Sequence, residues 1–299
     1  MSFIPANSNT SNKAPTPIFN ILLTMLAPIF WGTTYVVTTQ FLPTNLPLFA
    51  AVIRVLPAGI ILILMSRKLP QSGQWGRILI LSFLNISCFQ ALLFVAAYRL
   101  PGGIAAIVSG IQPLIIMTLL WQVNRIAPRP ITLTATITTI MGMALLLINP
   151  NSSWDIIGLI AALLGAVSMA FGIYLTKLWK PNVSNLTFTG WQLLFGGVML
   201  LPLALFLETF PTSLSINNIL GYAYLCIFGS LIAYALWFRG IEKLPSVAVS
   251  ILGALSPITA TIIGWAFLNE RLSTLQAIGF ILVLISVFVV QFTSKADKL

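Results

Sequence analysis

Hydrophobic residues follow one another along this chain in long runs, and polar or charged residues are confined to short gaps between the runs. A helix of about 20 mainly apolar residues spans the roughly 30 Å hydrocarbon core of a bilayer. Breaks at Pro, Gly, Asn and charged residues divide the chain into ten runs of about this length. The sequence therefore predicts ten membrane-spanning helices, at residues 20–41, 46–66, 75–98, 101–123, 130–149, 155–177, 186–207, 218–240, 245–268 and 273–293.

The composition agrees with a chain that is surrounded by lipid. Hydrophobic residues make up 58% of the 299 residues and charged residues only 7%, whereas soluble domains contain about 25% charged residues. So few charges cannot cover the surface of a soluble fold of this length. The formal net charge of +10 does not indicate nucleic-acid binding, because Lys and Arg occur singly or in pairs between apolar runs.

Lys and Arg residues are concentrated on one side of the predicted membrane. When the connections are assigned alternately to two sides, the side opposite to the N-terminus receives Arg99 and Arg271, and Arg54 falls within a span. The N-terminal side receives the other twelve: Lys13, Arg67, Lys68, Arg77, Arg125, Arg129, Lys177, Lys180, Arg239, Lys243, Lys295 and Lys298. Cytoplasmic loops carry the excess of basic residues, so both termini are expected to be cytoplasmic.

The second half of the chain repeats the first. An ungapped shift of 144 positions aligns Gln90 with Tyr234, Pro113 with Pro257, and Trp121 with Trp265. The earlier parts of the halves match more loosely, with "IFWGTTY" near "MAFGIYL" at a shift of 140. We therefore expect two five-helix repeats, at residues 20–149 and 155–293, between a disordered cytoplasmic tail of residues 1–19 and a short tail of residues 294–299.

Because five is an odd number, the second repeat should cross the membrane in the opposite sense. Inverted repeats are common in secondary transporters, since two related halves can exchange conformations and expose a midplane site to alternate sides. Between the ninth and tenth spans, Ser273 and Gln276 have the spacing of a capping box that opens a helix. Glu270 then lies in the preceding turn, either as a structural turn residue or as a gating or coupling group.

The motifs in these repeats resemble one known family. "FWGTTY" lies in the first span, Arg54 in the second, "RLPGGIAAIVSGIQPL" opens the fourth span and "PITATIIGWAFLNERLS" closes the ninth. Together they are similar to EamA-type transporters of the drug/metabolite transporter superfamily over residues 20–293. The resemblance implies an all-α integral membrane fold of two inverted five-helix repeats, located in a bacterial inner (plasma) membrane, with export of metabolites such as amino acids. One departure is that "QVNRIAPRP" in the first repeat has no counterpart of Glu270.

Polar residues inside spans are costly and tend to face a cavity or another helix. Ser230, Tyr234 and Trp237 lie at helical spacing on one face of the eighth span. Tyr234 has Gln90 as its repeat partner, and a second polar pair links the fourth and ninth spans. The candidates for lining a substrate cavity, with hydrogen bonding between helices as the alternative, are Gln90, Gln112, Ser230, Tyr234, Trp237 and Ser256.

Trp31 and Tyr35 in the first span are candidates for flat cavity walls, with packing on neighbouring helices as the alternative. Pro113 and Pro257 lie near the middle of the fourth and ninth spans, where a proline removes a helical hydrogen bond and can bend the chain. They are candidates either for static kinks or for hinges.

Arg54 is the one ionisable residue deep within a predicted span, about 12 Å from its outer edge. A lipid-facing Arg is costly at that depth, so Arg54 should face protein or water. Its partner is either a set of helix-end carbonyls or a substrate carboxylate. The five acidic residues all lie at predicted membrane edges or in the tail, which favours neutral, zwitterionic or anionic solutes over organic cations.

The sequence indicates no metal site and no cofactor, and without His or a deep acid an intramembrane enzyme is not expected. We therefore predict a secondary transporter that moves small amphipathic metabolites by alternating access, with the lipid bilayer and a small-molecule substrate as its partners. A multidrug efflux carrier for neutral or hydrophobic compounds and a non-transporting membrane receptor or structural protein are the alternatives. Substrate identity, energy coupling and oligomeric state have no recognisable signal in the sequence.

Overall fold

The described part of the chain contains ten helical segments that are long and apolar enough to cross a membrane, as the hydropathy pattern predicts. The computed structural model describes residues 17–43, 46–100, 102–147, 155–179, 182–209, 211, 213–267 and 273–294. Within these ranges there is no strand, and each span begins and ends within about three residues of its predicted bounds. The spans that consist of one helix are α1 (Pro17–Phe41), α2 (Pro47–Ser66), α7 (Pro130–Leu147), α8 (Ile156–Trp179), α9 (Asn185–Leu207) and α14 (Thr274–Thr293).

The third and eighth spans each contain a π-helical turn, which the hydropathy pattern does not predict. The third span consists of α3 (Trp75–Ser82), η1 (Phe83–Cys88) and α4 (Phe89–Arg99). The eighth consists of α10 (Ile216–Cys226), η2 (Ile227–Ile232) and α11 (Ala233–Lys243). The two π-turns are 144 positions apart, which is the offset of the sequence repeat. Single π-turns are rare and frequently occur at functional sites.

The fourth and ninth spans are interrupted just before Pro113 and Pro257. The fourth consists of α5 (Gly102–Ser109) and α6 (Gln112–Asn124), and the ninth of α12 (Ser246–Leu252) and α13 (Leu255–Phe267). Each proline lies in the first turn of the second piece, where its missing N–H costs no helical hydrogen bond. Each break lies within the four residues before its proline, where the proline ring disrupts the helical backbone, so the breaks agree with static kinks at Pro113 and Pro257; a role as hinges stays a prediction.

Capping boxes begin the last helix of the bundle and the eighth span. Ser273 Oγ accepts from the backbone N–H of Gln276 over 3.3 Å, and Gln276 Oε1 accepts from the backbone N–H of Ser273 over 2.9 Å. This is the box that the sequence predicts. Ser215 and Asn218 form a second one at the start of α10. Glu270, predicted to lie in the turn before α14, is outside the described residues.

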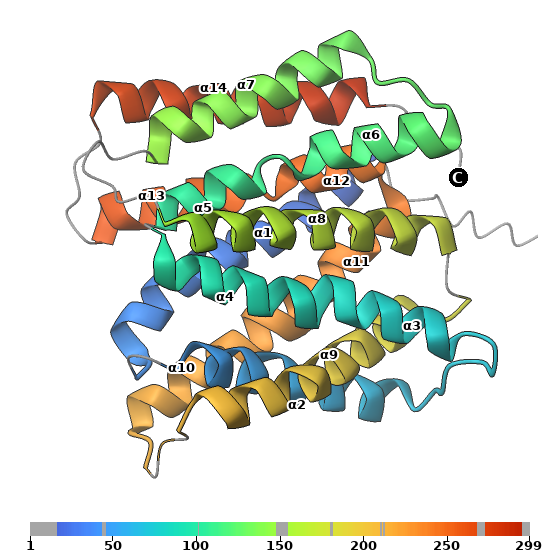
Figure 1. The fold of residues 1–299 in the computed structure, drawn as a ribbon, viewed down its shortest axis with the longest axis vertical. Helices are drawn as coiled ribbons and strands as arrows, with labels where there is room; N and C mark the ends of the chain where they lie inside the picture. Colours follow the sequence, from blue (N-terminus) through green and yellow to red (C-terminus); the bar gives the residue numbers. More distant parts are fainter. Residues whose placement is uncertain are drawn as a thin grey trace, which may run out of the picture.

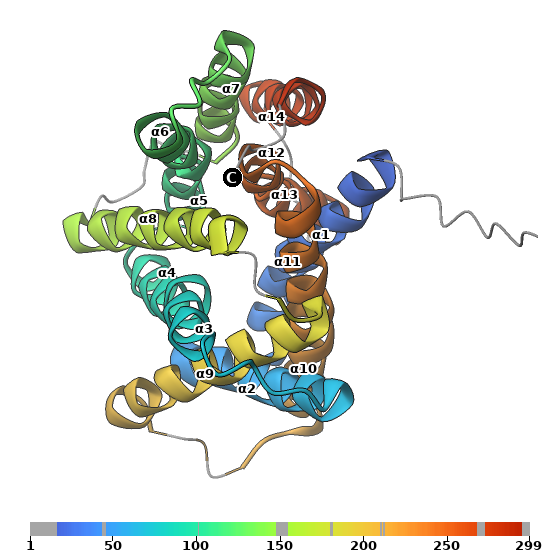
Figure 2. The ribbon, with the colours of Figure 1, turned by 90° about the vertical axis from the view of Figure 1, so that its right-hand side faces the viewer.

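The first helix of each half packs against the other half. In Figures 1 and 2, α1 lies against α11 and α13, whereas α8 lies against α4, α5 and α6. The α2·α9 pair closes one end of the long axis of the molecule, and the α7·α14 pair closes the other. The buried core is therefore built from both halves together.

Glycines bring partner helices of the two halves into close contact. A Cβ atom at Gly59 would lie 2.4 Å from the backbone nitrogen of Leu194, and one at Gly197 would lie 2.9 Å from Cβ of Leu56. Gly59 faces Leu194, three positions before Gly197, and Gly197 faces Leu56, three positions before Gly59. The contacts are therefore reciprocal, and α2 and α9 run antiparallel. A glycine from each of α7 and α14 makes the same kind of contact, which is typical of close helix packing in membranes.

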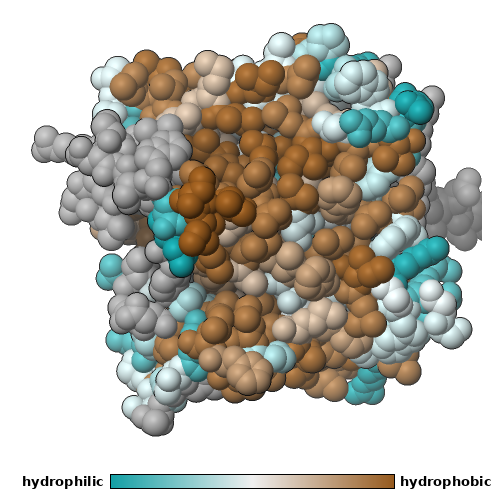
Figure 3. Space-filling view, in the orientation of Figure 1, coloured by the Kyte–Doolittle hydropathy of each residue, from teal (hydrophilic) through white to brown (hydrophobic). Residues whose placement is uncertain are grey.

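The outer surface is apolar over a broad band. Figure 3 shows hydrophobic residues across the middle of one face and hydrophilic residues gathered toward its edges. Large apolar side chains on several long helices are well exposed, such as Phe206 at 87% and Phe288 and Leu64 at 66%. Such a surface is unfavourable in water and suits the hydrocarbon core of a bilayer. The chain is therefore a multi-pass membrane protein.

Candidate functional site

Tyr234 of α11 and Gln90 of α4 meet in the buried interior. Gln90 Nε2 donates a hydrogen bond to the Tyr234 hydroxyl over 3.0 Å, and each residue is 1% exposed. The two residues are 144 positions apart, so each is bonded to its own repeat partner. Contacts of a residue with its own partner are characteristic of a two-fold axis between two copies. The predicted pair of cavity residues is thus brought together at the place where the two halves meet.

Aromatic side chains from α1 and α11 surround this pair. The ring centroid of Trp31 lies 5.2 Å from that of Tyr234 and 5.1 Å from that of Trp237, and Tyr234 stacks on Phe238 at 5.8 Å. Trp31 therefore joins the predicted stripe of the eighth span. Trp237 Nε1 and Gln90 Oε1 are buried polar atoms without a hydrogen-bond partner among the described residues.

Arg54 of α2 reaches the π-helical turn η2. Its Nη2 donates to the backbone oxygen of Gly229 over 2.9 Å, and its Nε donates to Ser230 Oγ over 3.3 Å. Trp31 Nε1 donates to the same Gly229 oxygen over 3.0 Å. Arg54 is only 9% exposed. Its described contacts are therefore internal, with a carbonyl in a π-turn and not at a helix end, and contact with a substrate carboxylate stays a prediction.

The remaining predicted site residues are not joined to this cluster. Gln112 begins α6 and Ser256 lies in the first turn of α13; both are half-buried, and neither is hydrogen-bonded to the cluster within the described part of the chain. The backbone oxygen of Ser256 lies close to Gly32, next to Trp31 in α1. Tyr35 lies in α1, but its side chain, like all of Glu270, is outside the described set.

A cleft of about 830 Å³ opens at the end of the bundle where α2, α8 and α11 terminate. Lys68, Lys177 and Glu242 line it, and Lys177 Nζ donates to the backbone oxygen of Glu242 over 2.9 Å. Phe238 also lines the cleft, and this ring stacks on Tyr234. A single aromatic side chain thus links the cleft wall to the central cluster. The volume is typical of a small-molecule site.

None of the residues that line this cleft is among the candidates that the sequence predicts. The lining comes from helix ends and connections, where polar residues are ordinary in a membrane protein. The one available signal was that Lys68 follows one span and Lys177 ends another, both on the same basic side. That pattern predicts orientation but does not distinguish a cleft from a flat surface.

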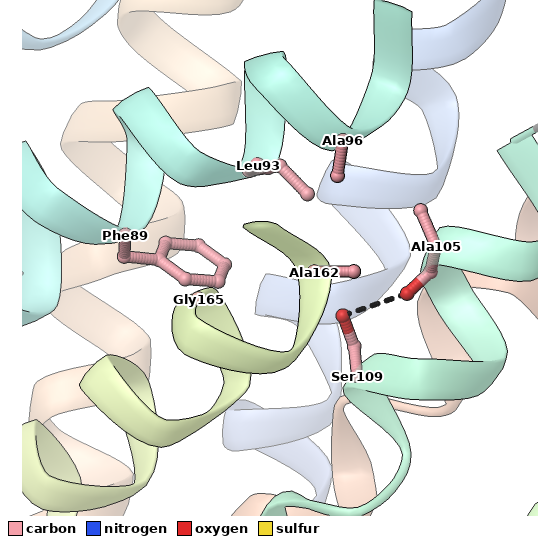
Figure 4. Close-up of a pocket in the computed structure, with 7 residues that line it drawn as sticks. All are labelled: Phe89, Leu93, Ala96, Ala105, Ser109, Ala162 and Gly165. Atoms are coloured by element: carbon pink, nitrogen blue, oxygen red, sulfur yellow. Dashed lines mark hydrogen bonds between the residues drawn. The ribbon is translucent and has the colours of Figure 1, made fainter. Parts of the chain in front are cut away.

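A second gap in the packing has a different character. Figure 4 shows Phe89 and Leu93 of α4, Ala162 of α8, and Ser109 of α5 around it. The Ser109 hydroxyl donates back to the oxygen of Ala105 over 3.0 Å, and the gap has no room for a water molecule. We interpret it as loose apolar packing. Within the described residues, no three His, Cys, Asp or Glu side chains gather at a common point that could hold a metal ion.

The helical bundle, its repeated π-turns and its buried polar centre define a multi-pass membrane protein of two related halves. The chain belongs to the EamA-like transporter family, which matches residues 18–148 and again residues 156–292. It is therefore a membrane transporter, and each half of the chain matches the family separately.

Known relatives span nearly the whole chain. Protein PecM of Dickeya dadantii is 45% identical over 274 residues, which cover 91% of this chain and 92% of PecM. A chloroplastic WAT1-related protein of Arabidopsis thaliana is 30% identical over 295 residues, covering 91% of this chain and 70% of that protein. The uncharacterized inner membrane transporter YedA of Escherichia coli is 27% identical over 274 residues, 89% of this chain and 88% of YedA. One crystal structure at 17% identity shares the fold, with a TM-score of 0.77 over 91% of this chain and 97% of that one.

Proposed function

We propose that this transporter exposes a central site to alternate sides of the membrane and moves small amphipathic metabolites, such as amino acids, outward. Reciprocal packing of the two halves carries the proposal. The repeat partners α2 and α9 run antiparallel, and Gln90 is bonded to its own partner Tyr234. Such contacts are expected when the second half is an inverted copy of the first, an arrangement in which the halves can exchange conformations.

The cleft supports a path that reaches the centre from one side. Phe238 forms part of its inner wall, packs edge to face on Phe188 at 5.5 Å, and stacks on Tyr234. On this proposal, movement of these aromatic rings joins the cleft to the Tyr234 cluster. Export then requires that the cleft opens to the cytoplasm, in agreement with the predicted cytoplasmic position of Lys68 and Lys177.

The chemistry along this path favours an amphipathic solute without a net positive charge. Lys68, Lys177 and Glu242 offer both signs of charge at the cleft, and Trp31 and Tyr234 offer aromatic surface at the centre. Among the charged side chains that the structure describes, Arg54 alone is buried. An organic cation would therefore meet a positive charge and no buried carboxylate within the described residues.

Counterflow in proteoliposomes tests the proposed function. Vesicles containing the purified protein are preloaded with a mixture of unlabelled amino acids and other metabolites, and entry of each labelled compound is measured. We expect saturable exchange of neutral, zwitterionic or acidic compounds. Tyr234→Phe, which removes the hydroxyl that accepts from Gln90, should slow exchange, whereas Tyr222→Phe removes a buried hydroxyl without a described hydrogen-bond partner and should not. Exchange of cations alone, or none by folded protein, would contradict the proposal.

Topology is tested separately. Cysteines placed at Lys13, Lys68 and Lys298 should all react with a membrane-impermeant reagent in inside-out vesicles. In right-side-out vesicles, the same three cysteines should be protected. If the two termini lie on opposite sides, the predicted count of ten crossings is wrong, and the inverted repeat fails with it.

A further inference from the structure

The π-turn η2 is held by side chains from the first two spans of the other half. Gly229 in this turn accepts hydrogen bonds from Trp31 in the first span and from Arg54 in the second. Arg54 also donates to the neighbouring Ser230 hydroxyl. We name the contact of Arg54 with Gly229 and Ser230 the arginine latch.

The π-turn η1 is held in a parallel way by the first two spans of the second half. Ser168 of α8 donates to the backbone oxygen of Leu84 over 2.8 Å. The next residue, Asn85, donates through Nδ2 to Gln192 Oε1 of α9 over 2.8 Å and to Thr176 Oγ1 of α8 over 3.2 Å. We name the contact of Asn85 with Thr176 and Gln192 the amide latch.

The two latches occupy equivalent positions in the repeat. Gln192 follows Arg54 by 138 positions, the offset that also relates the close-packing glycines of α2 and α9. Gly229 follows Asn85 by 144 positions, the offset that relates the two π-turns. The fold therefore places a polar residue of the second span of each half against the π-turn of the other, but with different chemistry.

The amide latch is the weaker of the two. The arginine latch contains a hydrogen bond from a charged donor to a backbone oxygen, and such bonds are about twice as strong as neutral ones. The amide latch is neutral, and Asn85 Oδ1 and Gln192 Nε2 have no hydrogen-bond partner although both residues are fully buried. A buried network that is only partly satisfied contributes little stability. Of the two latches, it can open at the lower cost.

The amide latch also adjoins the cleft. Thr176, which accepts from Asn85, is one of the residues that line the cleft. Gly172, one turn earlier in α8, has no space for a side chain because a Cβ atom there would lie within van der Waals radii of the Asn85 amide. The position of α8 along this wall is therefore coupled to the position of Asn85 in η1.

We propose that Asn85, Thr176 and Gln192 are positioning residues that hold η1 in the conformation whose cleft opens beside Thr176, and that this amide latch releases when the transporter opens to the opposite side. The inference rests on the proposed alternating access. The arginine latch stays closed through the cycle because breaking it would leave a buried charge without its partner. Release of the amide latch admits water that can satisfy the atoms left unpaired in this conformation.

Labelling of reporter cysteines tests the proposal without a substrate. One reporter is Asn182→Cys in the cleft, and the other is Phe94→Cys, whose repeat partner Phe238 lines the cleft and which should report opening to the opposite side. Both are made with Cys88 and Cys226 replaced by alanine. In the Gln192→Leu variant, the ratio of the Asn182→Cys labelling rate to the Phe94→Cys rate should fall about fivefold, the equivalent of one lost net hydrogen bond.

Matched variants separate this role from general destabilisation. Thr176→Val keeps the shape of the side chain, removes the acceptor for Asn85, and should lower the ratio in the same direction. Gln291→Leu and Thr136→Val change the same residue types, whose hydrogen bonds reach neither π-turn nor a residue of the cleft, and should leave the ratio unchanged. An unchanged ratio in Gln192→Leu and Thr176→Val, both folded, overturns the proposal, as does an equal fall in the two controls.

Failure of alternating access itself gives a different result. Phe94→Cys then stays unlabelled from the opposite side in the unmodified background, even during counterflow exchange. In the other case, Phe94→Cys is labelled in that background, but the ratio of the two labelling rates is the same in Gln192→Leu as in the unmodified background. Alternating access then stands and the role of Gln192 is refuted.

Discussion

Replacing Arg54 by Lys and by Met separates its contribution to stability from a contribution to substrate binding. Hydrogen bonds to charged groups contribute about 1.5–3 kcal/mol each. The compact ammonium of Lys cannot reproduce the separate contacts of Nε with Ser230 and of Nη2 with Gly229. Arg54→Lys therefore loses one of these bonds while keeping a buried charge, and we expect a loss of about 2–3 kcal/mol in stability.

Arg54→Met should cost less stability than Arg54→Lys. The Gly229 oxygen keeps its bond from Trp31 over 3.0 Å, and no charge is left buried without partners. We expect a loss of about 1 kcal/mol, since removing a buried charge together with its desolvation cost offsets much of the lost bonding. Thermal unfolding of the purified protein should therefore rank wild type above Met and Met above Lys.

Binding of a carboxylate substrate should rank the same two variants in the opposite order. If Arg54 also meets that carboxylate, Lys retains the attraction and Met loses it, so affinity for the acid falls from wild type to Lys to Met. The matching carboxamide should bind all three proteins about equally. Equal losses for acid and amide would refute the carboxylate contact, and a Lys variant as stable as wild type would refute the hydrogen-bond estimate.

Three further substitutions probe packing, charge and coupling. Gly59→Ala places a Cβ atom 2.4 Å from the α9 backbone and should cost about 2 kcal/mol, measured by thermal unfolding, whereas Gly73→Ala points into open space and should be neutral. A hydrogen bond from the backbone N–H of Gly158 is the main cause that holds the pKa of Asp155 below its ordinary value. The ionised Asp155 therefore stabilises the fold at pH values above its ordinary pKa, and this stability is lost as the pH falls through the lowered pKa. Asp155→Asn should flatten this acid dependence of the unfolding temperature, and an unchanged slope would contradict it. Glu270→Gln should leave counterflow exchange largely intact; complete loss in folded protein would show that Glu270 is not simply a structural turn residue.

The sequence by itself determined the class of protein, the number and bounds of the spans, and the repeat. Each of these depends on local properties. A bilayer requires about 20 apolar residues for each crossing, and the chain has few charges with which to cover any other surface. The capping box at Ser273 is equally local, because its two hydrogen bonds join residues three positions apart. The pairing of Gln90 with Tyr234 was also visible as a sequence offset, although not as a contact.

Only the tertiary structure decided which polar residues meet. Arg54 and Gly229 are 175 positions apart, and the Gly229 oxygen is a suitable acceptor because a π-turn lies there. Nothing in the local sequence of η1 or η2 predicts a π-turn, since a wider turn in a buried helix depends on partners from other helices. Gln192 was overlooked for the same reason: one amide in an apolar span has no evident role until α9 packs on η1 and places it beside Asn85.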